Sequence, residues 1–492
     1  MSLINISNLT FSYEGSFHNI FENVSFQIDT DWKLGFTGRN GRGKTTFLKL
    51  LMGKYEYSGT ISSNVTFEYF PYAVPDADSF VIDVIHEISP NAQDWEIVRE
   101  LSLLKVSDEL LYRSYSTLSK GEQTKALLAA LFLKENSFLL IDEPTNHLDI
   151  LGRKTLSDYL NKKHGFILVS HDRVFLDNCI DHILVINKTN IEVQRGNFSS
   201  WWKNKEMQDS FELAENEKHK KEISRLTAAA QKTSRWSDRV EKSKNGSTNS
   251  GSKLDKGYVG HKAAKMMKRS KTIENRQQDL IQEKSKLLKN LETAENLKIF
   301  PLPYHTSQLL ELSGVSIVYG SHPVCSNISF TIEQGDRVAL QGKNGSGKSS
   351  ILKLICGENI PYHGTLRKSE RLKISYVPQS TAGLNGPLSE YIERNLLDES
   401  LFKAILRKFD FPREQFEKRL DEFSEGQKKK VLLARSLCEQ AHLYIWDEPL
   451  NYIDVLSRMQ IENLLLEYKP TILFVEHDSA FCENIATKTV EL

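Results

Sequence analysis

The chain has few cysteines and lacks any long hydrophobic run. Its five cysteines show no C-x-x-C spacing, and each lies in or beside an apolar stretch: Cys179, Cys325, Cys356, Cys438 and Cys482. This pattern predicts buried, reduced thiols in a reducing compartment. No stretch approaches the roughly 18 apolar residues that a membrane-spanning helix needs, and the first residues lack the basic and apolar regions of a signal peptide. We therefore expect a cytoplasmic protein that is neither secreted nor membrane-spanning.

The chain also has no net charge of either sign, since 64 basic residues balance 64 acidic ones. The balance is uneven, because residues 231–271 contain twelve basic and three acidic residues, a net charge of +9. Taken alone, such a segment indicates either a solvated surface or a surface that binds a polyanion such as nucleic acid.

What the sequence does contain is one phosphate-binding pattern, G-x-x-x-x-G-K-[ST], in two copies at residues 38–45 and 342–349. Each copy follows a short apolar run and precedes an apolar segment with helical spacing, which predicts a strand, a loop and a helix. Glycines in the loop let backbone N–H groups approach phosphate oxygens closely. The residues expected to bind nucleotide here are Gly38, Asn40, Gly41, Gly43, Lys44, Thr45 and Thr46, and Gly342, Asn344, Gly345, Gly347, Lys348, Ser349 and Ser350.

The same landmarks follow both loops in the same order. A Ser-x-Gly segment lies 77 or 78 residues after the loop lysine, an Asp-Glu pair 22 residues after that glycine, and a histidine 28 or 29 residues after the glutamate. The landmarks are Ser119, Gly121, Asp142, Glu143 and His171 in the first half, and Ser424, Gly426, Asp447, Glu448 and His477 in the second. Two ordered sets in register indicate a duplicated domain rather than a chance pattern.

These residues resemble the ATP-binding cassette ATPases, and residues 142–149, DEPTNHLD, resemble the signature of the ABC-F family of soluble tandem ATPases. The resemblance implies ATP hydrolysis with ATP and Mg²⁺ as cofactors. The two loop lysines would contact the β and γ phosphates, the two glutamates would orient or deprotonate water, and the two histidines would contact the γ phosphate. The expected Mg²⁺ ligands are Thr45, Asp142, Ser349, Gln379 and Asp447.

In the cassette family, the Ser-x-Gly segment of one domain closes the nucleotide site of the other. This resemblance implies that the first phosphate loop is completed by Ser424 and Gly426, and the second by Ser119 and Gly121. ATP would then hold the halves together and hydrolysis would release them. Tyr13 and Tyr319 precede the loops by 25 and 23 residues, where the family stacks adenine, although either could be an ordinary core tyrosine.

The two halves depart from the family pattern in different ways. Gln379 stands where the family has its metal-contacting glutamine, but the first half has Tyr72 there, and tyrosine has no amide oxygen for Mg²⁺. The second half reads PLNYID at residues 449–454 in place of PTNHLD. The sequence therefore predicts two unequal sites.

The segment between the halves has the composition of long helices. Met266, Ile273, Leu280 and Leu287 recur at intervals of seven, which favours pairing with another helix, and residues 245–252 are polar and rich in Gly, Ser and Asn. The fold class expected is α/β, with two P-loop ATP-binding cassette domains, residues 1–198 and 305–492, joined by a long antiparallel α-helical hairpin at residues 199–304. The basic tip of the hairpin lies at about residues 240–262.

The basic tip is expected to contact nucleic acid through Arg239, Lys242, Lys244, Lys253, Lys256, Tyr258 and Lys262. The resemblance implies that this linker enters the bacterial 70S ribosome beside the P-site tRNA and 23S rRNA. Linker length and the absence of an arm insertion are similar to the Lsa type, which protects ribosomes from lincosamides, streptogramin A and pleuromutilins. The expected protein is a monomer that binds neither DNA nor membrane. The alternatives are a solvated linker, a housekeeping translation regulator of the same family, and a transporter ATPase subunit.

Overall fold

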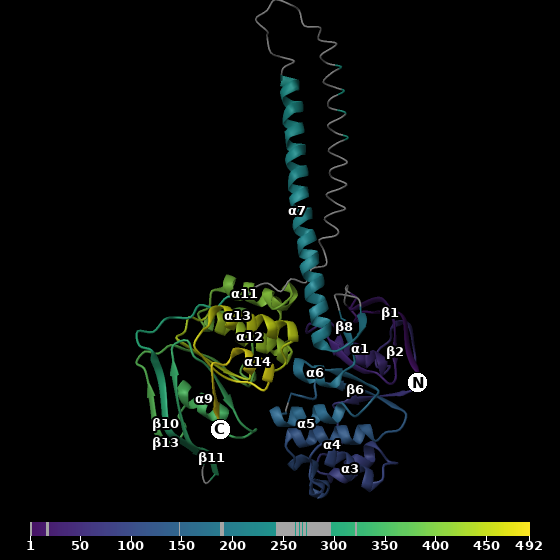
Figure 1. Cartoon of the computed structure of the whole chain (residues 1–492), viewed down its shortest axis with the longest axis vertical. Coiled ribbons are helices and arrows are strands. Elements are labelled where there is room, and N and C mark those ends of the chain that lie inside the picture. Colours follow the sequence, from purple (N-terminus) through teal and green to yellow (C-terminus); the bar gives the residue numbers. More distant parts are fainter. Residues whose placement is uncertain are drawn as a thin grey trace, which may run out of the picture. The chain divides into compact units, whose positions relative to one another are not determined.

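The computed structural model describes residues 2–15, 19–146, 148–186, 191–242, 261, 265, 268, 272, 297–319 and 322–492 (Figure 1). The chain divides into two units, and the first combines Met1–Trp201 with Ala294–Leu492. This unit contains two α/β halves, drawn in purple to blue and in green to yellow in Figure 1. The second unit is Trp202–Thr293, and each unit is described by itself.

The first half contains two sheets. One is antiparallel with the order β2-β1-β4, and the other has the order β5-β6-β7-β3-β8-β9, in which only the β8/β9 pair is antiparallel. The strands are β1 Leu3–Phe11, β2 Phe21–Asp29, β3 Lys33–Thr37, β4 Ser58–Ser62, β5 Thr66–Phe70, β6 Ser137–Asp142, β7 Phe166–Val169, β8 His182–Ile186 and β9 Ile191–Arg195. The middle of β6 and all of β7 are buried, as expected for parallel strands that are covered on both faces.

The helices of the first half begin close to the residues that the sequence singled out. They are α1 Lys44–Leu51, α2 Val81–Ile88, α3 Asp94–Leu103, α4 Lys120–Phe132, α5 Ile150–Leu160 and α6 Arg173–Cys179. Helix α4 begins with a capping box, because Ser119 Oγ accepts a bond from the N–H of Glu122 while the Glu122 carboxylate accepts one from the N–H of Ser119. The Ser-x-Gly segment of the first half therefore lies at a helix start.

The second half repeats this arrangement. Its sheets have the orders β11-β10-β13 and β14-β15-β16-β12-β17, and the second sheet is parallel throughout. The strands are β10 Gln308–Tyr319, β11 His322–Glu333, β12 Arg337–Gln341, β13 Tyr362–Lys368, β14 Ile374–Val377, β15 Leu443–Asp447, β16 Ile472–Val475 and β17 Lys488–Glu491. The helices are α9 Lys348–Cys356, α10 Leu388–Arg394, α11 Glu399–Lys408, α12 Glu425–Cys438, α13 Val455–Tyr468 and α14 Ser479–Ile485.

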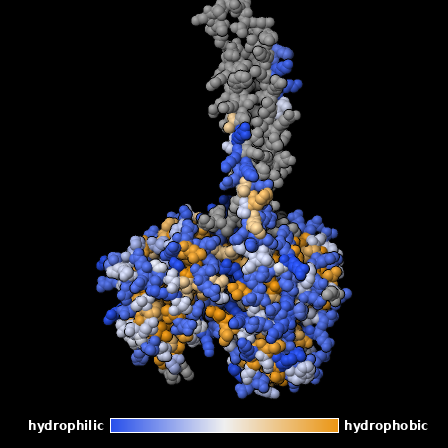
Figure 2. All heavy atoms as spheres, viewed as in Figure 1, coloured by the Kyte–Doolittle hydropathy of each residue, from blue (hydrophilic) through white to orange (hydrophobic). Residues whose placement is uncertain are grey.

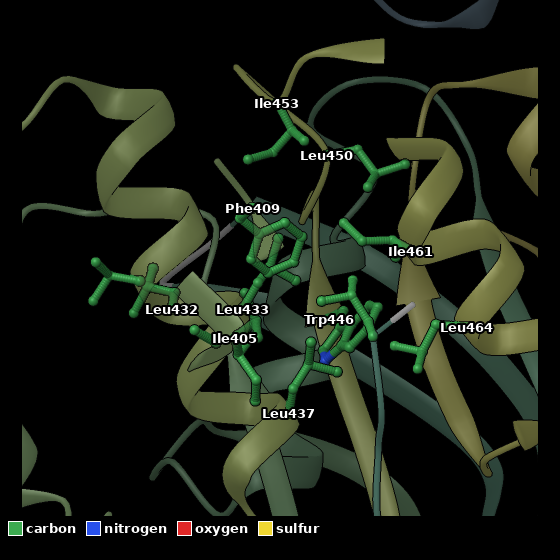
Figure 3. Close-up of a cluster of buried hydrophobic side chains, with 14 of the residues drawn as sticks. Ile405, Phe409, Leu432, Leu433, Leu437, Trp446, Leu450, Ile453, Ile461 and Leu464 are labelled. Atoms are coloured by element: carbon green, nitrogen blue, oxygen red, sulfur yellow. The ribbon is translucent and has the colours of Figure 1, made fainter. Parts of the chain in front are cut away.

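A continuous hydrophobic core fixes α11, α12 and α13 against β15 in the second half. Figure 3 shows Phe409, Leu433, Trp446 and Ile461 converging there. Trp446 is fully buried, and its indole N–H donates to Ser436 Oγ at 3.0 Å, so its polar atom is satisfied. This core holds the start of α12 and the acidic end of β15 in fixed positions.

The surface of the first unit is mainly hydrophilic on the face shown in Figure 2, with hydrophobic residues scattered in small groups. Across the part of the chain that the structure describes, no helix is both long and apolar enough to cross a bilayer. All five cysteines are free thiols, with Cys179, Cys325 and Cys482 buried and Cys356 and Cys438 partly exposed. The prediction of buried, reduced cysteines is therefore confirmed for three of them.

The structure confirms an α/β fold with two repeated halves. In the second unit it describes one long helix, α7 Phe198–Lys242, which covers the first part of the predicted hairpin. The returning half of the hairpin falls outside the described residues, apart from a few isolated positions. The antiparallel hairpin and the predicted domain boundaries therefore stay predictions.

Candidate nucleotide-binding sites

Both phosphate loops join a strand to a helix as the sequence predicted. The first loop connects β3 to α1 and the second connects β12 to α9. Gly43 and Gly347 precede the helices with φ of 94° and 91°, a left-handed conformation that favours glycine. A Cβ on Gly43 would lie 2.5 Å from the Ile20 side chain, so the position also has no room for a larger residue.

The lysine of each loop is buried against the loop's own carbonyl groups. Lys44 Nζ donates to Gly38 O at 2.7 Å, and Lys348 Nζ donates to Gly342 O at 2.9 Å. Burial lowers the pKa of both lysines. Each ammonium group is thus held over the loop whose N–H groups would surround a phosphate.

In the first half, the predicted metal ligands are in contact. Thr45 Oγ1 donates to Asp142 Oδ2 at 3.0 Å, and the Tyr69 hydroxyl donates to the same oxygen at 3.0 Å. Burial raises the pKa of Asp142, against the opposing effect of these hydrogen bonds. A hydroxyl and a carboxylate are the hard oxygen donors that Mg²⁺ prefers.

In the second half, both carboxylate oxygens of Asp447 are buried without a hydrogen-bond partner. Burial raises the pKa of this carboxyl to about 6. A buried carboxylate without a partner is costly unless it is compensated, and a cation would provide that compensation. The described residues contain no group of three or more His, Cys, Asp or Glu that could hold a metal.

Each candidate catalytic glutamate lies beside its histidine. His171 Nε2 is 3.3 Å from Glu143 Oε1, and His477 Nε2 is 3.5 Å from Glu448 Oε1. Both glutamates have a left-handed backbone, with φ of 50° and 45°, directly after the buried strands β6 and β15. The structure therefore brings the two predicted catalytic residues of each half together.

The two glutamates differ in their electrostatics. Burial, together with the charge of Asp142, raises the pKa of Glu143 to about 8, and burial also lowers the pKa of His171 well below its usual value. Burial acts to raise the pKa of Glu448, but hydrogen bonds from His477 and Gln379 lower this pKa to about 2. The Glu143 carboxyl is therefore harder to ionise than the Glu448 carboxyl.

The two Ser-x-Gly segments line cavities with the opposite phosphate loops. A cavity of about 890 Å³ is lined by Lys348, Ser349, Glu448 and His477 of the second half, together with Ser119, Gly121 and neighbouring residues of the first. Gln379 lines the same cavity. The predicted pairing of the second loop with the first half's Ser-x-Gly segment is thus seen in one cavity.

The first phosphate loop also lines a cavity with the second half. A cavity of about 250 Å³ is lined by Asn40, Gly41 and Arg42 together with Ser424 and Gly426. Asn40 Nδ2 donates to Tyr452 O at 2.6 Å. A Cβ added to Gly426 would lie 2.5 Å from Tyr452 O and 3.0 Å from Asn40 Nδ2, so only glycine fits this contact.

The two candidate adenine-stacking tyrosines are exposed rather than buried in the core. Tyr13 is 42% exposed and Tyr319 is 45% exposed. The Tyr13 hydroxyl lies 2.7 Å from Thr46 Oγ1, and the Tyr319 hydroxyl lies 3.4 Å from Ser350 Oγ. Both tyrosines therefore lie beside their phosphate loops and are partly exposed to solvent.

Three further residues at the sites were not found from the sequence. Tyr69 donates to Asp142, as described above. Lys429 is 1% exposed, and its Nζ donates to the carbonyl oxygens of Pro378, Gln379 and Asp447 at 2.8, 3.0 and 3.3 Å. Asp410 lies 3.2 Å from Arg42 NH2. Only the lysine run at residues 428–430, within an otherwise apolar helix pattern, gave any sequence signal.

The predicted nucleic-acid contacts lie in the linker and cannot be placed. Arg239 and Lys242 belong to α7, but their side chains fall outside the described residues, as do Lys244, Lys253, Lys256, Tyr258 and Lys262.

The sequence matches the protein family described as ABC transporter over residues 21–146 and 325–451. These two matches together cover just over half of the chain, and each includes a phosphate loop and an Asp-Glu pair.

Relatives align over nearly the whole chain. The ATP-binding protein Uup of Buchnera aphidicola (strain APS) is 29% identical over 99% of this chain and 80% of its own length. The ribosome protection protein VmlR of Bacillus subtilis is 29% identical over 98% of this chain and 85% of its own. The probable ATP-binding protein YbiT of Escherichia coli O157:H7 is 27% identical over 99% and 95%.

Among solved structures, the archaeal ribosome recycling factor aABCE1, in its complex with the ribosomal stalk protein aP1, matches with a TM-score of 0.63. It is 18% identical, and the match covers 98% of this chain and 87% of that one. At this identity the likeness concerns the fold alone.

Proposed function

We propose that this protein binds the ribosome in its ATP-bound state. The chain belongs to the ABC transporter family and is a tandem ATP-binding cassette protein of the ABC-F type that hydrolyses ATP. In the ATP-bound state the linker reaches toward the P-site tRNA and the peptidyl transferase centre and displaces bound antibiotics. The domains proposed are residues 1–198 and 305–492 for the cassettes and 199–304 for the linker.

The observation that carries the proposal is the composite cavity of about 890 Å³, in which Lys348 and Glu448 of one half share a lining with Ser119 and Gly121 of the other. ATP in such a cavity contacts both halves, and its binding energy favours their association. Hydrolysis removes the γ phosphate from between the loop and the opposite helix start, which weakens that association. The nucleotide thereby controls how the ends of the linker are held.

The proposed chemistry assigns separate roles to the residues at each site. Backbone N–H groups of the loop and Lys44 or Lys348 bind the phosphates. Mg²⁺ held near Thr45 and Asp142, or near Ser349, Gln379 and Asp447, would neutralise developing charge on the phosphate oxygens. Glu143 or Glu448 orients the attacking water and accepts its proton, and the adjacent histidine holds the carboxylate and contacts the γ phosphate.

Two features support the ribosome as the partner. VmlR, a ribosome protection protein, shares 29% identity with this chain over 98% of its length. Residues 231–271 carry a net charge of +9, which suits a surface that binds nucleic-acid phosphates. The proposed linker-tip contacts are Arg239, Lys242, Lys244, Lys253, Lys256, Tyr258 and Lys262.

The proposal is tested by co-sedimentation with bacterial 70S ribosomes. We expect the Glu143→Gln, Glu448→Gln double variant to pellet with ribosomes in ATP and Mg²⁺ but not in ADP, because ATP would stay bound without being cleaved. The matched control is a Lys44→Ala, Lys348→Ala double variant, which should not pellet in either nucleotide. Failure of the glutamine variant to pellet in ATP would overturn the proposal.

A second candidate is a translation regulator of the same type without a drug phenotype. It is favoured by the equal identity, 29%, to the ATP-binding protein Uup. Expression in a susceptible bacterium distinguishes the two. Target protection predicts raised inhibitory concentrations for lincosamides, streptogramin A and pleuromutilins, whereas the regulator predicts no change for all three.

A further inference from the structure

Three ion pairs join the two halves beside the first phosphate loop and the first catalytic histidine. Asp410 of the second half lies 3.5 Å from Arg39 NH1 and 3.2 Å from Arg42 NH2 of the first phosphate loop. Glu462 of the second half lies 2.5 Å from Arg173 NH2 of the first. In each of these contacts the first half supplies the cation and the second half supplies the carboxylate.

The first of these contacts is built into the first composite site. Asp410 lines the cavity of about 250 Å³ with Asn40, Arg42 and Gly426. It lies in a left-handed turn, with φ of 61°, that ends α11, and its N–H donates to Arg407 O at 2.9 Å. The carboxylate is therefore held by the backbone where it faces the arginines of the opposite loop.

The second contact is largely shielded from water. The Arg173 side chain is 16% exposed and the Glu462 side chain 9% exposed. Glu462 also accepts a bond from Asn484 Nδ2 at 2.6 Å, which fixes the carboxylate. Arg173 begins α6, two residues after His171 of the first site. Ion pairs of low exposure are weakened less by salt than exposed ones.

The equivalent positions of the second composite site have different charges. The second phosphate loop has Lys343 and Ser346 where the first has Arg39 and Arg42. The place of Asp410 is taken by Lys105, which follows α3 in the same left-handed turn, with φ of 53° and its N–H bonded to Ser102 O at 3.0 Å.

Lys343 and Lys105 carry like charges and cannot form an ion pair. The positions equivalent to Glu462 and Arg173 are Ser157 and Ser479, which carry no charge. Duplication has thus preserved the backbone of the two interfaces, while their charges have become different.

We propose that Asp410 and Glu462, with Arg39, Arg42 and Arg173, form an electrostatic latch that keeps the first composite site assembled while the second opens to exchange nucleotide. The latch acts through ion pairs at the first interface that the residues at the equivalent positions of the second cannot form. Asp410 and Glu462 are positioning residues, because they touch the opposite half rather than the nucleotide.

The latch is tested by ATP release from the isolated protein, without ribosomes. A Glu143→Gln, Lys348→Ala background restricts radiolabelled ATP to the first site, and a Glu448→Gln, Lys44→Ala background restricts it to the second. After a chase with unlabelled ATP, the first site should release its label more slowly. Adding Asp410→Lys should speed release from the first site by roughly threefold to tenfold and leave the second unchanged.

A gain of function separates the latch from general damage to the fold. Lys105→Asp places a carboxylate in the turn equivalent to that of Asp410 and should slow release from the second site. The exposed Glu390→Lys, which reverses a charge on α10, should change neither site and serves as the control. Equal release from both sites, or acceleration of both by Asp410→Lys, would overturn the latch. Because ribosomes are absent, that result would leave the ribosome proposal intact.

Discussion

Replacing Glu143 or Glu448 with glutamine should have unequal effects on ATP hydrolysis at pH 7. The two residues occupy equivalent places after β6 and β15, but their environments differ. Burial and the charge of Asp142 raise the pKa of Glu143 to about 8, whereas hydrogen bonds from His477 and Gln379, acting against burial, hold that of Glu448 at about 2. A carboxylate must be ionised to accept a proton from water, so the two sites should differ in active fraction.

The magnitude follows from these pKa values. At pH 7, about one tenth of Glu143 is ionised and nearly all of Glu448, since one pH unit below the pKa leaves about 10% in the basic form. If the sites are otherwise alike, Glu448→Gln removes about nine tenths of the ATPase rate and Glu143→Gln removes about one tenth. In Glu448→Gln the remaining rate should rise about tenfold per pH unit up to about pH 8 and then level off, while in Glu143→Gln it should be flat.

The assay is steady-state phosphate release at saturating ATP and Mg²⁺ between pH 6 and 9, with the double glutamine variant as the blank. Mg²⁺ near Asp142 would offset the negative charge of Asp142, which is one cause of the raised pKa of Glu143. At lower Mg²⁺ concentration, the ATPase rate of Glu448→Gln should therefore rise at a higher pH. Glu390→Gln, on the exposed surface of α10, is the matched control. Superimposable profiles, or a larger loss from Glu143→Gln at pH 7, would refute the reasoning.

Three further predictions concern stability and the interface. Glu143→Gln should raise the melting temperature of the nucleotide-free protein more at pH 8 than at pH 5. The pKa of Glu143 is higher in the folded than in the unfolded protein, so its contribution to stability is present at low pH and is lost as the pH rises through about 8. A larger gain at pH 5 would contradict this. Phe402→Ala should lower the unfolding free energy by about 3–5 kcal/mol in urea titrations, because the ring is fully buried and leaves a cavity; a loss below about 1 kcal/mol would contradict it. Gly426→Ala should reduce ATPase activity in the Glu448→Gln background, because the new Cβ would lie 2.5 Å from Tyr452 O. The control Gly383→Ala should leave the activity unchanged, because a Cβ there has open space. Equal effects of the two variants would contradict the importance of the contact.

The parts of the site that could be predicted depend on local sequence. The phosphate loops, the Asp-Glu pairs and the helix starts at Ser119 and Ser424 all follow from residue types at fixed spacing, and the structure has them as expected. The difference between Tyr72 and Gln379 was also visible, and the unequal sites that it predicts stay a prediction. The pairing of each loop with the opposite half came from family resemblance, since local sequence does not specify it.

The parts that could not be predicted depend on contacts between distant segments. Asp410 and Arg42 are 368 residues apart, and nothing in the local pattern of either marks the other as its partner. Lys429 has the helical spacing of an ordinary core position, and only its place in the fold explains why a buried ammonium is tolerated there. Three carbonyl oxygens accept its bonds, so the desolvation cost is offset.

The ends of the linker should move differently if only one of the two composite sites opens. If both composite sites opened together, the two halves would separate and the ends of the linker would move apart by translation. If the first site stays latched through Asp410, opening of the second turns one half about the first site. The linker leaves the first half at Phe198 and rejoins the second at Leu297, so its two ends rotate relative to one another. Hydrolysis at the second site would therefore turn one half about the first, rather than separate both halves.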